Sequence, residues 1–442
     1  MHFALCFLDL CNLCNLWTML FDEALAYLLS LGHETLTIKL GLRNTETLLA
    51  ALGDPHKSFP SVQIAGTNGK GSTAVMLDSI CRAAGIRTGL FTSPHLISIT
   101  ERIRVNGADI SENDFARLTS QVKETAEGLV SAGELAALPT FFEHVTAIAL
   151  LAFREAQVDL AILETGLGGR LDSTTAAGAD VVAITPIAMD HQEYLGNTLA
   201  EIAGEKAAII RPGVIAIVAP QADEVRDVIL QRCQSVGVTP EFVTPAIERD
   251  ELPLALRGRH QATNAATAIA IADALVAKSF QISREAILNG LKSAKHPGRL
   301  ELWAGEPQML FDGAHNPAAA RALRNYLDEF VAVPITMMFG AMRDKALNEM
   351  AAILFPAARE LILTQVENPR AASIELMQAA LPRDLNSRIH LAGSVSDALR
   401  IAKKVTPADG LVCVTGSLYL IGEVQQSVRE SLEAQSRKLG SL

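Results

Sequence analysis

Short apolar runs alternate with longer amphipathic segments along the chain, and this alternation predicts an α/β fold. Buried strands are expected at 62–65, 86–91, 158–164, 181–185 and 214–218, and residues 101–105 alternate as an edge strand does. Helices are expected at 19–31, 45–52, 73–84, 111–128, 142–156, 199–210, 222–235, 260–278 and 283–291. Strands interleaved with helices form a doubly wound, mainly parallel sheet, whose functional side chains gather at the carboxyl ends of the strands.

The alternation restarts after a Pro-Gly break in the segment KHPGR (295–299). Further strands are expected at 308–312, 334–339, 359–364 and 411–414, with helices at 317–329, 345–354, 373–380 and 396–404. A chain of 442 residues also exceeds one ordinary domain of about 150 residues. We therefore expect an N-terminal domain at 19–295, a linker at 296–299 and a smaller α/β domain at 300–442.

The first 18 residues differ from the rest of the chain. They are apolar, but they carry no Lys or Arg for a signal peptide, and Asp9, Asn12 and Asn15 interrupt any run that could span a bilayer. We expect Met19 to be the natural start and residues 1–18 to be a non-native or disordered extension. The competing interpretation is a packed N-terminal helix.

Charge and cysteine content exclude some classes of partner and suggest a compartment. Lys plus Arg number 38 and Asp plus Glu 49, so the net charge of −11 argues against nucleic acid held by bulk electrostatics. Aromatic residues, at 5%, offer few rings for base stacking. The Cys11-x-x-Cys14 pair lacks the second pair of ligands that a zinc site needs. A reduced, cytoplasmic protein that does not bind a membrane is expected.

A glycine-rich turn follows the first buried strand, in PSVQIAGTNGKGST (60–73). Glycines let backbone N–H groups crowd around an anion, the following helix adds the positive end of its dipole, and Lys70 adds a full charge. The usual P-loop spacing is not met, because Ile64 stands where its first Gly would be and Gly71 separates Lys70 from Ser72. The turn is predicted to bind a nucleotide phosphate chain; a glycine-rich surface turn is the alternative.

Two further strand ends carry groups with suggestive chemistry. Glu164 ends the strand 158–164 and precedes a second glycine-rich turn, and His191 follows the strand 181–185. Because the carboxyl ends of parallel strands meet at one edge of a sheet, Lys70, Glu164 and His191 are expected to lie together.

Ten motifs occur in an order that resembles folylpolyglutamate synthase and dihydrofolate synthase, of the Mur-ligase superfamily. They are GTNGKGS (66–72), TSPHL followed by ERI (92–103), TFFE (140–143), ETGLGGRLDST (164–174), DH (190–191), GEKAAIIRPG (204–213), HQATN (260–264), PGR (297–299), DGAHNP (312–317) and TGSLYLIGEV (415–424). The resemblance covers about residues 20–424. It implies a P-loop-containing central domain of the Mur-ligase type and a C-terminal domain of the glutamate-ligase type.

The resemblance implies an ATP-dependent amide ligase that acts in monomeric form. A carboxylate of dihydropteroate or a reduced folate attacks the γ-phosphate of ATP, and the amine of L-glutamate then displaces phosphate from the acyl phosphate. In the first step a carboxylate anion attacks an anionic phosphate, so the site must supply cations and fixed hydrogen-bond donors that offset the repulsion between them. The family implies two Mg²⁺ sites, a carbamate on Lys206 and a monovalent cation.

The roles that the resemblance implies fall into four groups. The ATP-binding residues are Thr67, Asn68, Gly69, Lys70, Gly71, Ser72, Asn264, Arg299 and Asp312. The metal ligands are Ser93, Glu164, His191 and carbamylated Lys206. The catalytic residues are Lys70, Lys206, His191 and His315, the last close to the acyl phosphate. The residues that bind the pterin-bearing substrate are Leu40, Gly41, Leu42, Thr140, Phe141, Phe142, Glu143, Leu171, Asp172 and Ser173.

Each role has a structural alternative when the residue is taken alone. His191 could be a hydrogen-bonded core histidine, Lys206 a solvated or salt-bridged helix lysine, and Phe141 and Phe142 core residues. The remaining alternatives are the polar face of a helix for Asn264, a linker ion pair for Arg299 and a helix N-cap for Asp312.

Departures from the family pattern are few. Thr175 stands where the family usually has Asn, and Ala346 stands where a second Asp is common. A Mur-type ligase with another carboxylate substrate is one alternative function. A nucleotide-binding regulatory protein without turnover is another, but it predicts loss of Lys70, Glu164, His191 or Lys206, and all are intact. The sequence leaves open which glutamate is added; an enzyme with both activities is expected.

Overall fold

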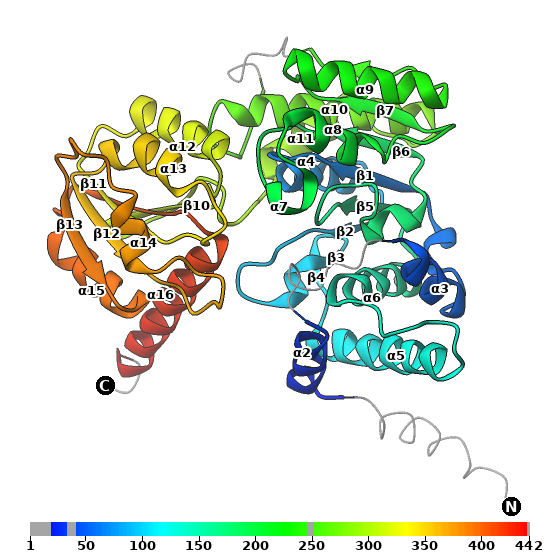
Figure 1. Cartoon of the computed structure of the whole chain (residues 1–442), viewed down its shortest axis with the longest axis horizontal. Helices are drawn as coiled ribbons and strands as arrows, with labels where there is room; N and C mark the ends of the chain where they lie inside the picture. Colours follow the sequence, from blue (N-terminus) through cyan, green and yellow to red (C-terminus); the bar gives the residue numbers. More distant parts are fainter. Residues whose placement is uncertain (1–18, 33–40, 245–251, 440–442) are drawn as a thin grey trace, which may run out of the picture.

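The computed structural model describes residues 19–32, 41–244 and 252–439, and within them it places two α/β units side by side (Figure 1). The predicted extension 1–18 and the predicted substrate residue Leu40 lie outside the described residues. One unit is built on an eight-stranded sheet and the other on a six-stranded sheet. The chain crosses from one to the other between the last helix of the first unit and the first strand of the second, and the predicted linker 296–299 lies in this crossing.

The N-terminal unit has a mainly parallel sheet with strand order β4-β3-β2-β5-β1-β6-β7-β8. Among these strands only β3 is reversed, because its pairs with β2 and with β4 are antiparallel and the other pairs are parallel. The strands are β1 Ser61–Ala65, β2 Thr88–Phe91, β3 Ile103–Val105, β4 Ala108–Asp109, β5 Leu160–Glu164, β6 Val181–Ile184, β7 Ile215–Val218 and β8 Glu241–Phe242. The phosphate-turn strand β1 lies between β5 and β6 at the centre, so its carboxyl end is flanked by two other strand ends.

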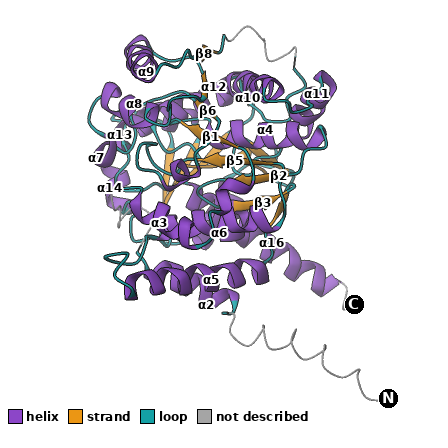
Figure 2. Ribbon diagram, turned by 90° about the vertical axis from the view of Figure 1, so that its right-hand side faces the viewer, coloured by secondary structure: helices purple, strands orange, loops and turns teal. Residues whose placement is uncertain are grey.

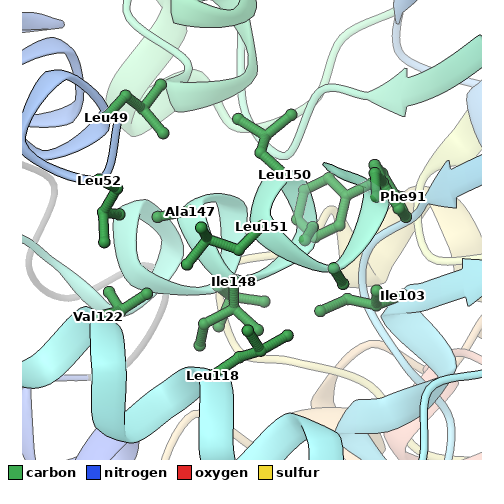
Figure 3. Packing of buried hydrophobic residues seen from close by; sticks show 14 of the residues in the cluster. Leu49, Leu52, Phe91, Ile103, Leu118, Val122, Ala147, Ile148, Leu150 and Leu151 are labelled. Carbon is green, nitrogen blue, oxygen red and sulfur yellow. The ribbon is translucent and has the colours of Figure 1, made fainter. Parts of the chain in front are cut away.

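Helices cover both faces of this sheet (Figure 2). They are α2 Phe21–Ser30, α3 Arg43–Ala51, α4 Lys70–Ala83, α5 Glu112–Ser131, α6 Phe141–Glu155, α7 Gln192–Leu195, α8 Leu199–Ala207, α9 Asp223–Val236, α10 His260–Ala277 and α11 Arg284–Ser293. On one face, Ile148 and Leu151 of α6 pack between Leu118 of α5 and the strand residues Phe91 and Ile103 (Figure 3). On the other face, α4 is buried along almost its whole length beneath α10 and α11.

The C-terminal unit has strand order β13-β12-β11-β14-β10-β9, and only β9 is antiparallel. Its strands are β9 Glu301–Trp303, β10 Gln308–Asp312, β11 Ile335–Phe339, β12 Glu360–Thr364, β13 Arg388–Ala392 and β14 Leu411–Thr415. Its helices are α12 Pro317–Phe330, α13 Leu347–Leu354, α14 Ile374–Ala379, α15 Val395–Val405 and α16 Leu418–Leu439. None of the helices in the described part of the chain is long and apolar enough to cross a membrane.

The predicted fold class is confirmed, and most predicted elements lie within a few residues of the observed ones. The short strands β4 and β8, the strands β9 and β13, and the helices α7 and α16 were not predicted. β13 is an edge strand with Arg388 and His390 on one side, so it has no continuous apolar run. Helix α4 begins at Lys70 rather than Thr73, because Gly69 takes a left-handed conformation (φ 89°) and turns the chain directly into the helix.

A buried histidine in α6 should make stability depend on pH. His144 is fully buried; its Nδ1–H donates to the carbonyl oxygen of Thr140 at 3.1 Å, and its Nε2 accepts the hydroxyl of Tyr27 at 3.1 Å. Burial lowers the pKa of His144 to about 4. The unfolded chain therefore binds this proton near pH 6.5 and the native state only near pH 4, so stability falls as pH drops through this window.

We expect the urea midpoint of the native chain to fall between pH 7.5 and pH 4.5, and we expect this fall to be smaller in His144→Gln. The difference corresponds to about 3 kcal/mol at most, at 1.36 kcal/mol per pKa unit. An equal fall in both proteins would show that His144 is not the group responsible.

Candidate active site

A cavity of about 560 Å³ opens between the two units at the carboxyl ends of the central strands. Most of the predicted site residues line it. They are Thr67, Asn68, Gly69, Lys70, Gly71, Ser72, Ser93, Thr140, Phe142, Glu143, Glu164, Leu171, Asp172, Ser173, His191, Lys206, Asn264, Arg299, Asp312 and His315. Gly41, Leu42 and Phe141 do not line it, and Phe141 packs in the core beneath the Arg102 guanidinium.

The phosphate turn, residues 66–72, is held in place by hydrogen bonds to the loop that follows β6. The N–H groups of Thr67 and Asn68 both donate to the carbonyl oxygen of Pro186 at 3.1 Å. The Thr67 hydroxyl donates to the carbonyl of Ala188 and accepts its N–H. The first N–H groups of α4 have no partners within the helix. The N–H groups at the start of α4 are therefore available to bind an anion, whereas Thr67 holds the turn in place through its hydrogen bonds to Pro186 and Ala188.

Two lysines donate to the carbonyl oxygen of Gly66, the first residue of this turn. Lys70 donates to the carbonyl oxygens of Gly66 at 3.1 Å and Thr67 at 3.3 Å. Lys206, near the end of α8, is buried and donates to the carbonyl oxygen of Gly66 at 2.8 Å. Burial, reinforced by the charge of Lys70, lowers the pKa of Lys206 to about 7. A large share of Lys206 is therefore a neutral amine near pH 7.

Glu164 and Ser93 meet where β5 and β2 end side by side. The buried carboxylate of Glu164 accepts the backbone N–H of Ser93 at 3.1 Å. Burial raises the pKa of Glu164, against the opposing charges of Lys70, Arg299 and Arg102. A carboxylate in this position gains from a nearby cation.

His191 presents an unpaired nitrogen in the same region. It takes a left-handed conformation (φ 51°) before α7, and its Nδ1 is buried without a hydrogen-bond partner. Burial lowers the pKa of His191 to about 3, with the charges of Lys345, His315 and Lys206 acting in the same direction. The imidazole is therefore neutral, as a metal ligand must be.

These donors fit a divalent cation. A buried carboxylate, an orphaned imidazole nitrogen and a serine hydroxyl, from Glu164, His191 and Ser93, are suitable ligands for Mg²⁺ or Mn²⁺. Across the described residues, no three His, Cys, Asp or Glu side chains converge closely enough to hold a metal by themselves. Oxygen atoms of a nucleotide and of water would complete the coordination.

Asp190 joins the two units directly beside these donors. Its carboxylate accepts Lys345 Nζ at 2.7 Å and Asn316 Nδ2 at 3.1 Å, both from the C-terminal unit, and His315 Nε2 lies 3.5 Å away. The side chains of Asp190 and Lys345 are each only 7% exposed. Burial alone would raise the pKa of Asp190, but the hydrogen bond and charge of His315, with the charges of His191 and Lys345, hold it well below its usual range.

Asn316 extends this junction to the phosphate turn. Its side-chain amide donates to Asn68 Oδ1 at 3.0 Å, and its own oxygen caps α12 by accepting the N–H of Ala319. Sequence reasoning missed Asn316 and Lys345 as site residues. The available signals were the Asn-Pro start of α12 and the position of Lys345 after a strand end.

The remaining predicted ATP residues line the same cavity as the start of α4. Asn264 Oδ1 lies so close to Gly69 that a Cβ there would approach it to 2.2 Å. Arg299 donates to the carbonyl of Gly313 at 3.2 Å, and Asp312 accepts the N–H groups of Leu300 and Ala314. Sequence reasoning also missed His296, whose Nδ1 forms a 3.1 Å hydrogen bond with Ser72 Oγ.

Two predicted substrate-binding carboxylates are already hydrogen-bonded to the protein. Asp172 accepts the N–H groups of Gly166, Leu167 and Thr174 and the hydroxyl of Thr174, so it fixes the second glycine-rich turn. Glu143 accepts the N–H of Thr140 at 2.7 Å and the hydroxyl of Thr45 at 3.1 Å. Both residues shape the wall of the cavity.

Sequence comparison matches both units to known families. Residues 64–238 match the Mur ligase middle domain, and residues 298–418 match the Mur ligase glutamate ligase domain. The dihydrofolate synthase/folylpolyglutamate synthase of Bacillus subtilis is 34% identical, over 90% of this chain and 97% of the relative. A probable bifunctional folylpolyglutamate synthase/dihydropteroate synthase of Halobacterium salinarum is 37% identical over 92% of this chain. The chain spans about half (51%) of the length of that archaeal relative.

Solved structures share the whole fold. Mycobacterium tuberculosis folylpolyglutamate synthase complexed with ADP superposes with a TM-score of 0.85 at 29% identity, over 92% of this chain and 97% of that chain. Escherichia coli FolC in complex with DHPP and ADP gives 0.82 at 32% identity, over 93% and 98%. A bifunctional folylpolyglutamate synthase/dihydrofolate synthase with Mn, AMPPNP and L-glutamate bound gives 0.80 at 32% identity, over 93% and 98%.

Both the full-length sequence match to the B. subtilis relative and the shared two-unit fold point to one assignment. This chain belongs to the folylpolyglutamate synthase/dihydrofolate synthase family of Mur ligases.

Proposed function

We propose that this chain is an ATP-dependent ligase that joins L-glutamate to dihydropteroate and to reduced folylpolyglutamates. The observation that carries the proposal is the single cavity that holds the phosphate turn, the donors Ser93, Glu164 and His191, and the polar edge of the C-terminal unit. Relatives with this fold bind ADP with DHPP, or AMPPNP with Mn and L-glutamate. A Mur-type ligase with another carboxylate substrate is the alternative.

Lys70 and the start of α4 would hold the polyphosphate so that a substrate carboxylate can attack the γ-phosphate. This attack brings two anions together, and positioned cations lower its barrier more than any other group can. A divalent cation held by Ser93, Glu164 and His191 would supply charge neutralisation at the phosphate oxygens. The product is an acyl phosphate, with ADP as the leaving group.

The second step needs a dry cavity with the amine of glutamate in place. Water would hydrolyse an acyl phosphate, so the C-terminal unit has to cover the site while the intermediate exists. Asp190 supports this arrangement, because its hydrogen bonds bring Asn316 and Lys345 to the edge of the phosphate turn. His315 Nε2 lies 3.5 Å from Asp190, and this position supports the proposal that His315 acts close to the acyl phosphate.

We further propose that Lys206 reacts with carbon dioxide to form a carbamate. The neutral amine of Lys206 attacks the carbon of CO₂: an N–C bond forms, the electrons of one C=O π bond move to oxygen, and the nitrogen loses one proton to solvent. The product is an anionic carbamate whose oxygen would be a ligand for a second Mg²⁺. The lowered pKa of Lys206 and its burial beside Lys70 support this reaction. The monovalent cation, the monomeric state, the cytoplasmic location and the domain boundaries at 295 and 300 stay predictions.

Phosphate release tests the proposed activity. With ATP, Mg²⁺ and L-glutamate, the chain should release phosphate when either 7,8-dihydropteroate or a tetrahydrofolate monoglutamate is added. Lys70→Ala should lower the rate by roughly a hundredfold or more, because a cation is removed from the transferred phosphate. Lys57→Ala, a change at an exposed surface lysine, should not. If folded protein that still binds ATP releases no phosphate with either substrate, the assignment moves to a ligase with another carboxylate substrate.

Carbamate formation on Lys206 has its own spectroscopic test. Protein equilibrated with ¹³C-labelled bicarbonate should show a carbamate carbon resonance that grows as pH rises through about 7, since only the neutral amine reacts. The resonance should be absent in Lys206→Gln and present in Lys57→Gln. If Lys206→Gln retains the resonance, or the native chain never shows it, the carbamate proposal is wrong.

A further inference from the structure

The loop that follows β2 inserts a side chain into the core of the other unit. Leu96 is half-buried and packs against the C-terminal cluster that includes Phe311, Leu420 and Val424. In Figure 1 the first turns of α16, drawn in red, face the N-terminal unit that carries this loop. The tip of the loop therefore forms an apolar contact between the units, separate from the polar junction at Asp190.

Glycine is required where this loop meets α16. A Cβ on Gly422 would lie 2.0 Å from the carbonyl oxygen of Leu96 and 2.9 Å from its carbonyl carbon. These are backbone atoms, so no side-chain rotation can relieve the clash. Gly298 of the crossing segment lies on another side, since a Cβ there would be 3.3 Å from both Leu96 methyl groups. A glycine within a helix lowers its stability relative to alanine, so the close approach explains its use at 422.

The other end of the same loop carries the proposed metal donors. Ser93 lies three residues before Leu96 in the sequence and donates its N–H to Glu164. Glu101 accepts the N–H groups of Leu96, Ile97 and Ser98. Glu101 and Glu164 thus hold both ends of this short loop by hydrogen bonds to its backbone, and only Pro94 and His95 separate Ser93 from Leu96.

We propose that Leu96 and Gly422 form a positioning contact through which the C-terminal unit fixes Ser93 and Glu164 for metal binding. Neither residue touches the metal or the nucleotide; they act through the backbone of the loop 93–96. The inference rests on the proposed function, in that it takes Ser93 and Glu164 as metal donors. It assigns to α16 a part in the geometry of a site that lies on the other unit.

Metal affinity measured without turnover tests this contact. Free Mn²⁺ is followed by electron paramagnetic resonance while full-length protein with AMPPNP is titrated, and AMPPNP binding is measured separately in EDTA. Gly422→Ala should weaken Mn²⁺ binding by roughly tenfold, the scale of changes that reorient metal ligands from outside the coordination shell. AMPPNP affinity in EDTA should stay close to that of the native chain, which would show that the variant is folded and that its phosphate turn is intact.

Glycine-to-alanine changes without the close approach serve as controls. A Cβ on Gly393, in the C-terminal unit, or on Gly128, within α5, would meet nothing within 4 Å. Gly393→Ala and Gly128→Ala should leave Mn²⁺ binding unchanged. Unchanged Mn²⁺ binding in Gly422→Ala, or an equal loss of AMPPNP binding with and without metal, would overturn the proposal.

Leu96→Ala keeps the test decisive if Gly422→Ala fails to fold. It removes the inserted side chain, so it should weaken Mn²⁺ binding in the same direction. If Gly422→Ala does fold, the double variant should lose less than the sum of the two changes. Unchanged Mn²⁺ binding in Leu96→Ala would contradict the positioning role. If the native protein releases phosphate with folate substrates but the variants bind Mn²⁺ as the native protein does, the positioning contact is wrong and the proposed function stands. Native protein that binds no Mn²⁺ would overturn the metal site as well.

Discussion

A buried carboxylate cannot stay charged without partners, and Asp190 finds its cationic partner on the other unit. Lys345 and Asn316 reach across the cavity to it, and the side chains of Asp190 and Lys345 are almost fully covered. Removing one member of such a pair leaves an uncompensated charge, which is far more destabilising than the loss of a surface ion pair. The relative placement of the two units therefore depends on satisfying this one group.

The site follows from that placement. The N-terminal sheet supplies the phosphate turn and the metal donors, because β1, β5, β2 and β6 end side by side. The C-terminal unit supplies Lys345 and His315 to the wall of the cavity, and its Asn316 joins them at Asp190. The apolar contact of Leu96 with α16 holds the same two units on another side of the cavity. A polar junction at Asp190 and an apolar junction at Leu96 thus fix the position of the metal donors of the N-terminal unit relative to the polar side chains of the C-terminal unit.

The sequence was informative wherever chemistry is local. The turn 66–72 could be identified because glycine, lysine and a preceding apolar strand are adjacent in the chain, and the structure places it on the cavity. The sequence could not show that the carbonyl oxygen of Pro186 accepts the N–H groups of Thr67 and Asn68, because these hydrogen bonds join residues more than a hundred positions apart. The same holds for the hydrogen bonds that occupy Asp172 and Glu143. The edge strand β13 was missed because it is mostly exposed and because Arg388 and His390 alternate with its apolar residues, so no continuous apolar run marks it.

A double-mutant cycle on Asp190 and Lys345 tests most directly whether this pair holds the site together. The catalytic efficiency kcat/KM for ATP is measured for Asp190→Asn, Lys345→Met and the double variant, with the exposed pair Asp180 and Lys278 as a matched control. Each single change should lower kcat/KM strongly, and the double variant should lose much less than the product of the two, because each change removes the same interaction. At the exposed control pair, all changes should be close to neutral. Independent, multiplicative losses at Asp190 and Lys345 would contradict the account.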